Sequence, residues 1–508
     1  MTDYFEQLHA LVWGVPTLVL ILGTGIWLSI RTGLAQLRLF PSACREFVRR
    51  LLGRDGSETG VSSFQALCTA LAATVGIGNL AGVAGAIALG GPGAVFWMWV
   101  SGFLGMVVKF AEVTLAVHFR QKNPSGEFVG GPMYIIRHGM GEKWSFLAGI
   151  YCFFGVVAAF GVGNATQINA VITSIGQTAA SFGGSLTTTG KLMIGLALAV
   201  FVGFMLFGGA GRVGRIAELL VPFAAGGYVL LCVAALILRA DALPQALQAI
   251  FRGAFHPRAV TAGAVGSMLF ALRTGVSRGV FTNEAGMGTA SIAHASAGVD
   301  DPVRQGLMGI MEVFIDTIVI CTMTALVILT SGVPIVYGVD CGAELTMQAF
   351  SAVFGDWICV AITLALCLFA IATVLGWGLY GARCAQYLFG DSAWKRFAAL
   401  QVAAVVLGSV IHTGTVWLLA ELLNGLMAIP NLIALWALSS TLKSILNKSS
   451  GTISAGGGTY EDIYQRQPLR TVSHAQIPSV GRGRGEAGKA HLSPEHRPAR
   501  PADAEGIL

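Results

Sequence analysis

Residues 73–93 read ATVGIGNLAGVAGAIALGGPG, and this stretch decides how the chain folds. Seven of its twenty-one residues are glycine; it contains no charged residue and a single amide, Asn79. A glycine inside a helix costs about 0.5–1 kcal/mol relative to alanine, so an ordinary helix would not favour this composition. The stretch is also too apolar for a surface loop, so its glycines need a specific reason.

The rest of the chain is equally apolar. Of 508 residues, 54% are hydrophobic and only 11% are charged, with a mean hydropathy of +0.70. A soluble domain carries about 25% charged residues. Residues 10–30 contain no charge and are long enough to cross the ~30 Å hydrocarbon layer of a lipid bilayer. The composition predicts an all-α polytopic membrane protein.

Charged segments divide the chain into about eleven predicted transmembrane helices. Loops on one side of these spans hold sixteen Lys and Arg residues, and loops on the other side hold three. Because positive charge collects on the cytoplasmic side, this bias predicts a cell-membrane protein with its N-terminus outside and its C-terminus in the cytoplasm. It also explains the net charge of +6 without a nucleic-acid partner. The predicted spans are 10–30, 62–89, 94–119, 146–173, 190–210, 215–238, 263–290, 305–331, 352–382, 397–412 and 415–441.

Inside a membrane span, the glycines of the opening stretch have two interpretations. Small residues at 78 and 82 would let neighbouring helices approach closely. Alternatively, the helix breaks at membrane depth, where its freed N–H and C=O groups bind a ligand. We expect the unwound part at 74–78, with Asn79 adding a side-chain ligand. The G-x-G-x-x-A pattern that begins at residue 76 does not follow a strand, which excludes a dinucleotide site.

A second interrupted span favours the broken-helix interpretation. Residues 264–297 read AVGSMLFALRTGVSRGVFTNEAGMGTASIAHASA, in which an apolar half runs into arginines, glycines and hydroxyl residues. Transporters with internal repeats place such breaks at corresponding positions of their two halves. We expect this break around 270–275. The alternative is two short elements joined by a surface loop.

Several longer motifs occur in order along the chain. They are GIGNLAGVAGAIALGGPGAVFWMWV (76–100), KFAEVTLAVHFR (109–120), GGPMYII (130–136), RGVFTNEAGMGTASIAHA (278–295), VLGWGLYGARCAQYLFG (374–390) and NGLMAIPNLIAL (424–435). Together they resemble the alanine or glycine:cation symporters, the sodium:alanine symporter family. The resemblance covers roughly residues 5–445 and implies the LeuT-like fold, ten core helices in two inverted halves of five, with one added N-terminal helix. It divides the chain into 1–61 (the extra helix and a basic loop), 62–240 and 241–448 (the two halves) and 449–508 (a disordered cytoplasmic tail).

The resemblance implies a secondary active symporter that imports a small neutral amino acid, alanine or glycine, together with sodium. It implies a substrate site formed by Thr74, Gly76, Gly78, Asn79, Phe160, Phe270, Gly275 and Trp377. It implies a sodium site formed by the carbonyls of Ala72, Val75 and Ala370 with the hydroxyl of Thr373. A cytoplasmic gate is expected at Arg278, Glu284 and Glu312, with Lys109 as a further ion-pair partner and with Glu312 and Asp316 near a helix end that water can reach. Asn164 and Gln167 are expected to hold helices together through amide hydrogen bonds.

Other functions remain open at this point. The substrate could be another neutral amino acid such as glutamine or D-alanine, and a proton could replace sodium. A passive channel would show no uphill accumulation. An enzyme is not expected, since the sequence has no HExxH, GxSxG or Walker motif, and we expect no cofactor besides the coupling ion. The oligomeric state cannot be read from the sequence.

Overall fold

The computed structural model describes residues 12, 14–53, 60–257, 261, 267–339, 342–411 and 414–454. Most of these residues are helical, and one short hairpin is formed by β1 (Gln121–Lys122) and β2 (Phe128–Val129). The start of the first predicted span and most of the predicted tail lie outside the described residues. Helix α23 (Ser439–Ser454) runs through the predicted boundary at residue 448.

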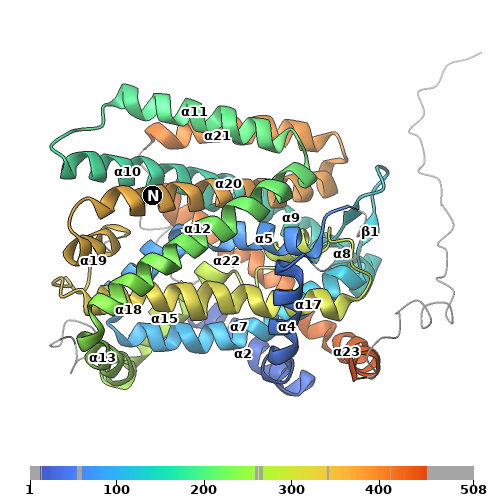
Figure 1. Ribbon diagram of the computed structural model, residues 1–508. Coiled ribbons are helices and arrows are strands. Elements are labelled where there is room, and N and C mark those ends of the chain that lie inside the picture. The colour runs from blue at the N-terminus through green and yellow to red at the C-terminus, as the bar shows by residue number, and fades with distance from the viewer. Residues whose placement is uncertain are drawn as a thin grey trace, which may run out of the picture. The chain divides into compact units, whose positions relative to one another are not determined.

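Most of the long helices run side by side (Figure 1). Helix α7 packs against α17, and α11 packs against α21, while α20 lies between α9, α10 and α12. These helices coincide closely with the predicted spans. They are α2 (Val15–Thr32), α7 (Gly93–His118), α9 (Ser145–Phe160) followed by η4 (Gly161–Ala165) and α10 (Thr166–Ser181), α11 (Thr188–Leu206), α12 (Ala210–Leu238), α17 (Pro302–Val313) followed by η6 (Phe314–Cys321) and α18 (Thr322–Thr330), α20 (Ile358–Phe389), α21 (Ala393–Val410) and α22 (Gly414–Ala437).

The predicted multi-pass helical class is confirmed, whereas the count of eleven spans stays a prediction. Among the described residues, seven helices are long and apolar enough to cross a membrane, or up to nine if each of two bent pairs is one span. The first helix passes only as a shorter apolar helix, Pro16–Thr32. It begins at a proline and ends at Gly33, whose left-handed conformation (φ 64°) stops the helix.

The first glycine-rich span is broken, as the sequence predicts. Helix α5 (Ser63–Thr74) starts at a capping box and ends where Val75 turns to extended backbone (φ −76°, ψ 95°). The chain then continues through η1 (Gly78–Gly82) into α6 (Val83–Gly90), bent by 51° from α5. The break therefore lies at residues 75–77, inside the predicted unwound segment.

The second span is also interrupted, but the predicted position of the break is wrong. Residues 270–275 lie within α15 (Met268–Asn283), and the chain leaves the helix only after Asn283, before α16 (Thr289–His294). Gly275 does not unwind the helix but allows close packing, because a Cβ there would lie 2.2 Å from the carbonyl oxygen of Ala94. The break instead uses the left-handed backbone of Glu284 (φ 53°) and of two glycines, Gly286 and Gly288.

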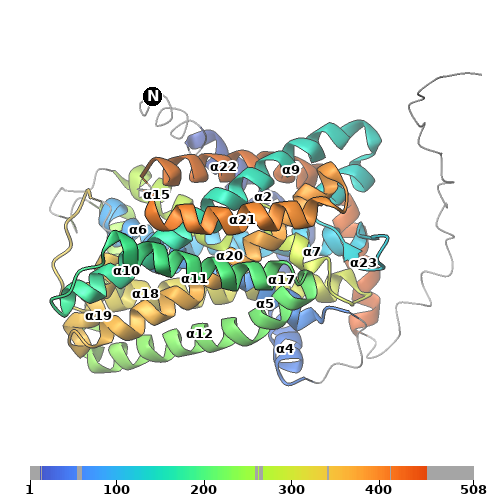
Figure 2. The ribbon, with the colours of Figure 1, turned by 90° about the horizontal axis from the view of Figure 1, so that it is seen from above.

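Short elements cover the two ends of the helical body (Figures 1 and 2). We call the end that carries the β1–β2 hairpin, α8 (Pro132–Tyr134) and η2 (Ile135–Met140) the hairpin end. The opposite end carries α13 (Leu243–Phe255) and α19 (Glu344–Phe354). The remaining short elements are α3 (Ala35–Arg38), α4 (Phe40–Leu51), η3 (Glu142–Trp144) and η5 (Ala240–Ala242).

Candidate functional site

The break in the first span is held open by the side chain of Asn79. Its Oδ1 accepts a hydrogen bond from the backbone N–H of Gly76 at 2.8 Å. Its Nδ2 donates to the Asp316 carboxylate on η6 at 2.7 Å. Both side chains are fully buried. An amide that substitutes for the missing helical bonds makes the unwound backbone compatible with a dry interior.

Helix α20 approaches the same break from the other side. The hydroxyl of Thr373 donates to the carbonyl of Ala72 at 3.0 Å. A Cβ on Gly76 would lie 2.7 Å from that hydroxyl oxygen, so only glycine fits there. Ala370 is buried one turn earlier on α20. The structure thus brings the predicted sodium-site residues of α5 and α20 together.

Gln167 on α10 is also beside the break, which the sequence interpretation missed. Its Nε2 donates to the carbonyl of Val162 at 3.0 Å, but its Oε1 is buried without a hydrogen-bond partner. A Cβ on Gly76 would lie 3.8 Å from that oxygen. Asn164, in contrast, holds helices together as expected, since its Nδ2 donates to the Gln401 carbonyl of α21 at 2.9 Å. The sequence did contain a signal for this position of Gln167, because it is an amide inside a membrane span and lies three residues after Asn164.

The second break is held by a carboxylate on α7. Oε1 of Glu112 accepts the backbone N–H groups of Gly286 at 2.9 Å and Gly288 at 3.1 Å, and the Nδ2 group of Asn431 on α22 at 2.7 Å. Glu284 accepts hydrogen bonds from Trp377 Nε1 at 2.9 Å and from the Thr289 hydroxyl. Buried polar groups from three helices therefore fix this segment.

Asp316 connects the two breaks. One carboxylate oxygen faces Asn79, and the other accepts the hydroxyl of Thr317 at 2.8 Å. Thr317 in turn accepts from Nδ2 of Asn283, the last residue of α15, at 3.1 Å. Gly78 lies against the same helix, since a Cβ there would be 3.0 Å from the methyl of Thr282. A buried carboxyl group therefore lies between the two interrupted spans.

A second buried charge cluster corrects the predicted gate. Glu312 is fully buried and not accessible to water, because it lies between Lys109 Nζ at 3.1 Å and His294 Nε2 at 3.2 Å. The sequence left open which basic residue pairs with which of the buried acids, and the structure pairs Lys109 with Glu312. Glu284 lies in the second break, and Arg278 lies on the helical part of α15. The three predicted gate residues are thus not one surface ion-pair group.

Three predicted substrate residues, Phe160, Phe270 and Gly275, do not lie in the breaks. Phe270 is 43% exposed in the first turn of α15. Phe160 packs its ring on Phe397 of α21, with centroids 5.1 Å apart. The Thr74 hydroxyl donates a hydrogen bond to the Ala70 carbonyl of its own helix at 3.3 Å. The indole N–H of Trp377 donates to the carboxylate of Glu284.

The hairpin end is closed by backbone and side-chain contacts. The N–H of Gly298, just after α16, donates to the carbonyl of Val61, just before α5, at 2.8 Å. Arg120 lies over the ring of Phe128 at 3.7 Å and donates to the carbonyl of Val299 at 2.6 Å. Burial lowers the pKa of Arg120 to about 10. The ends of the two broken spans are therefore joined at this face.

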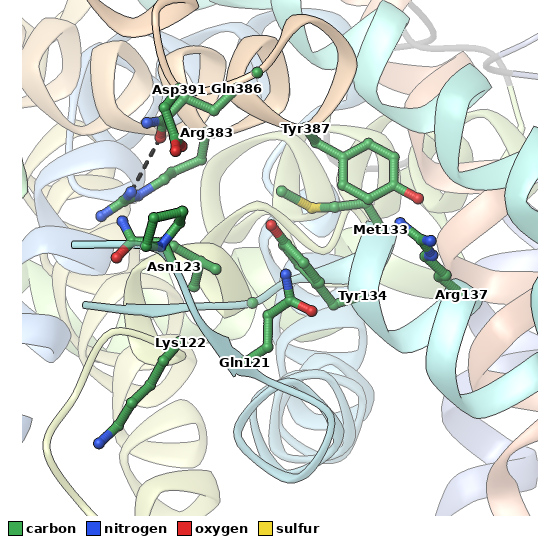
Figure 3. A pocket seen from close by; sticks show the side chains of 14 residues that line it. Gln121, Lys122, Asn123, Met133, Tyr134, Arg137, Arg383, Gln386, Tyr387 and Asp391 are labelled. Atoms are coloured by element: carbon green, nitrogen blue, oxygen red, sulfur yellow. Dashed lines mark hydrogen bonds between the residues drawn. The ribbon is translucent and has the colours of Figure 1, made fainter. Parts of the chain in front are cut away.

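Two cavities open at the hairpin end. One cavity has a volume of about 240 Å³, and no residue of either break lines it. Figure 3 shows Arg383, Tyr134, Tyr387 and Arg137 around it. The other, of about 500 Å³, lies beside the start of α5. Its lining comprises Gly60, Val61, Gln65, Lys122, Ser125, Gly126, Glu127, Phe128, Ala210, Gly211, Arg215, Ser296 and Arg383.

Two interrupted spans that meet at a buried polar centre, inside a multi-pass helical body, define a secondary transporter. Comparison with solved structures agrees on the fold. The structure of MhsT in complex with L-phenylalanine matches with a TM-score of 0.53 and 14% sequence identity, over 77% of this chain and 98% of that chain. The fold is therefore LeuT-like.

The chain belongs to the sodium:alanine symporter family, whose model matches residues 1–459, and it is therefore a transporter rather than an enzyme. It is 41% identical over 448 residues to the sodium/alanine symporter AgcS of Methanococcus maripaludis, covering 86% of this chain and 95% of that protein. It is 40% identical over 443 residues to an uncharacterized transporter of Haemophilus influenzae, covering 86% and 93%. It is 36% identical over 465 residues to the probable sodium/glutamine symporter GlnT of Bacillus subtilis, covering 89% and 92%.

Proposed function

We propose that this protein imports alanine or glycine together with sodium, by alternating access around the breaks of its first and second interrupted spans. The observation that carries the proposal is the contact of Thr373 with the Ala72 carbonyl. A hydroxyl on α20 there meets the carbonyl end of α5, where helix-terminal oxygens and the negative end of the helix dipole favour a cation. Sodium is proposed to lie among the oxygens of Ala72, Val75, Ala370 and Thr373.

The substrate is proposed to bind on the other side of the same break. The first amides of the following helix, at Ile77 and Gly78, favour a carboxylate, whereas the amide of Gly76 already bonds to Asn79. The unpartnered Oε1 of Gln167 is an acceptor for the substrate ammonium group. The backbone carbonyls at 270–275 are not available for this contact, because these residues are helical.

Energetics are sufficient for concentrative uptake. One sodium ion moving through ~100 mV releases about 2.3 kcal/mol, and a tenfold sodium gradient adds about 1.4 kcal/mol. The sum of ~3.7 kcal/mol would concentrate a neutral substrate roughly 500-fold. If sodium binds before the site closes around the substrate, the entry of sodium and the uptake of the amino acid are coupled.

The sidedness follows from the charge bias of the loops. The hairpin end carries the arginine- and lysine-rich loops, so we propose that it faces the cytoplasm and that the opposite end faces outward. The Gly298–Val61 bond and Arg120 would then close the cytoplasmic exit. The 10–30 helix would place the N-terminus outside.

Uptake of labelled alanine into proteoliposomes tests the proposal. An inward sodium gradient should drive accumulation above the external concentration, and replacing sodium by choline should abolish it. Uptake that is independent of sodium would overturn the proposal. Competition by glycine, D-alanine and glutamine would set the substrate, because a relative carries the name of a sodium/glutamine symporter.

A further inference from the structure

Helix α4 lies across the long helices near the hairpin end (Figure 1), and its inner face packs on two of them. The ring of Phe40 meets the ring of Phe314 on η6, with centroids 4.8 Å apart. The ring of Phe47 approaches that of Phe64 at the start of α5, with centroids 6.5 Å apart. Helix α4 therefore contacts both the inner half of the first broken span and the helix that carries Asp316.

The outward face of α4 is apolar and exposed. One side of the helix, at spacings of four, three and four residues, carries Pro41, Arg45, Val48 and Leu52. All four are exposed, and Arg45 is the only charged residue among them. Together with the neighbouring Leu51, the two aliphatic residues of this side are 49–59% exposed. A helix in water would carry polar side chains at these positions, so this face is suited to contact with an apolar medium.

This face continues the exposed apolar surface of the first helix. Helix α2 exposes Val19, Ile26 and Ile30, and the short helix α3 that follows it exposes Leu34 and Leu37. Helix α4 begins only eight residues after α2 ends. Because the long helices cross the bilayer, a helix that runs across them lies along its plane. An apolar surface that continues from a membrane helix onto such a helix places α4 at the boundary between acyl chains and headgroups.

The charges of α3 and α4 are complementary to anionic headgroups. Residues 35–52 contain four arginines and a single acid, Glu46. That carboxylate pairs with Arg49 at 2.6 Å and with Arg50 at 2.9 Å. Arg38 and Arg45 are exposed, and neither forms an ion pair with an acid in the described part of the chain. A long arginine side chain can lie along an apolar surface while its guanidinium group reaches a headgroup phosphate.

We propose that α4 binds anionic phospholipids of the cytoplasmic leaflet. Arg38 and Arg45 bind the headgroup phosphates, and Val48, Leu51 and Leu52 enter the adjacent acyl region. The cytoplasmic leaflet is the one whose anionic lipids attract basic segments beside a membrane helix. Bound lipid then holds at the membrane surface the helix that contacts both α5 and η6. The inference rests on the proposed function only for its sidedness, which decides the leaflet.

Hydrogen–deuterium exchange of the full-length protein in lipid nanodiscs tests the proposal without requiring transport. Peptides from residues 40–52 should exchange about threefold or more slowly with about 30% phosphatidylglycerol than in phosphatidylcholine alone. Raising NaCl from about 50 mM to about 500 mM should remove this difference, because salt screens the charges. The double variant Arg38→Gln/Arg45→Gln should remove it at low salt. Arg239→Gln/Arg252→Gln, which changes two arginines near the opposite end, is the matched control and should retain it.

Val48→Gln separates the apolar contact from the charged one. It should speed exchange of residues 40–52 in both lipids and leave the difference between the lipids in place. Equal exchange in neutral and anionic nanodiscs, or a difference that survives Arg38→Gln/Arg45→Gln, would overturn the inference. Protection of the same peptides by free glycerol phosphate in neutral nanodiscs would also overturn it, because the arginines would then bind a soluble phosphate. Nanodiscs expose both leaflets, and sodium-driven alanine uptake tests the proposed function separately, so failure of one is distinct from failure of the other.

Discussion

The side-chain amide of Asn79 donates to the carboxylate of Asp316 at 2.7 Å, and this contact joins the unwound first span to the neighbouring helix η6. The carboxylate is fully buried, and none of the described Lys, Arg or His residues forms an ion pair with it. A buried negative charge of this kind is costly unless a cation or a proton compensates it. Its position between the two breaks suits a site that binds cations transiently.

Replacing this charge tests its role. Asp316→Asn preserves size and one acceptor oxygen but removes the negative charge, so sodium-driven alanine uptake should fall by about tenfold or more. Initial uptake rates in proteoliposomes measure the effect. Asp356→Asn, an exposed carboxylate that bonds to Ser351 at the opposite end, should behave as wild type. Wild-type uptake by Asp316→Asn would show that its charge is not needed.

Removing the Thr373 hydroxyl should change mainly the sodium dependence of uptake. Thr373→Ala removes one proposed ligand, and the sodium concentration for half-maximal uptake should rise by about tenfold, with a smaller effect on the maximal rate. Thr373→Ser keeps the oxygen and should restore the sodium dependence. An unchanged sodium dependence in Thr373→Ala would exclude this hydroxyl as a ligand.

Removing the side-chain oxygen of Gln167 should change mainly the KM for the amino acid. Gln167→Met keeps the length of the side chain but removes the unpartnered oxygen, so the KM for alanine should rise by about tenfold, while the sodium dependence changes little. Gln177→Met on the same helix, at the surface near the opposite end, is the matched control. Equal KM values for Gln167→Met and wild type would contradict the proposed contact with the ammonium group.

Gly76 should not tolerate a side chain. In Gly76→Ala the new methyl would meet the Thr373 hydroxyl at 2.7 Å, so transport should be lost even where the protein still folds. Gly226→Ala, inside α12 with open space around it, should instead stabilise the helix by about 0.5–1 kcal/mol. Uptake and thermal unfolding of both variants in detergent give the comparison. Normal transport by Gly76→Ala would mean that the break is wider than described.

Glu112 should be the structural residue of the second break. Glu112→Ala leaves the amides of Gly286 and Gly288 and the side chain of Asn431 without their acceptor, which should cost roughly 2–5 kcal/mol of stability. Glu112→Gln retains an acceptor oxygen and should lose much less. Thermal unfolding midpoints of the detergent-solubilised variants measure the difference. Similar midpoints for the two variants would rule out this acceptor role.

Much of the architecture was predictable because a bilayer imposes strong and local constraints. Hydropathy located the long helices to within eight residues at each end, and the glycines at 76 and 78 located the first break. The resemblance to the symporter family, and not a local pattern, indicated the Thr373 hydroxyl that meets α5. The position of the second break was misjudged because glycine, serine and arginine at 275–279 weaken a helix locally. The close packing of α15 on α7 keeps these residues helical.

A multi-pass helical protein with interrupted spans follows from the order of residues alone, since the hydrocarbon layer excludes unpaired backbone groups and tolerates breaks in a helix only where polar groups are satisfied. Which polar side chains satisfy those groups depends instead on how the helices pack in three dimensions. Asp316 and Gln167 reach the first break, Glu112 reaches the second, and Glu312 is enclosed with Lys109 and His294. These partners are far apart in the chain, and hydrogen bonds between them depend on how the helices pack, which no local pattern of residues contains.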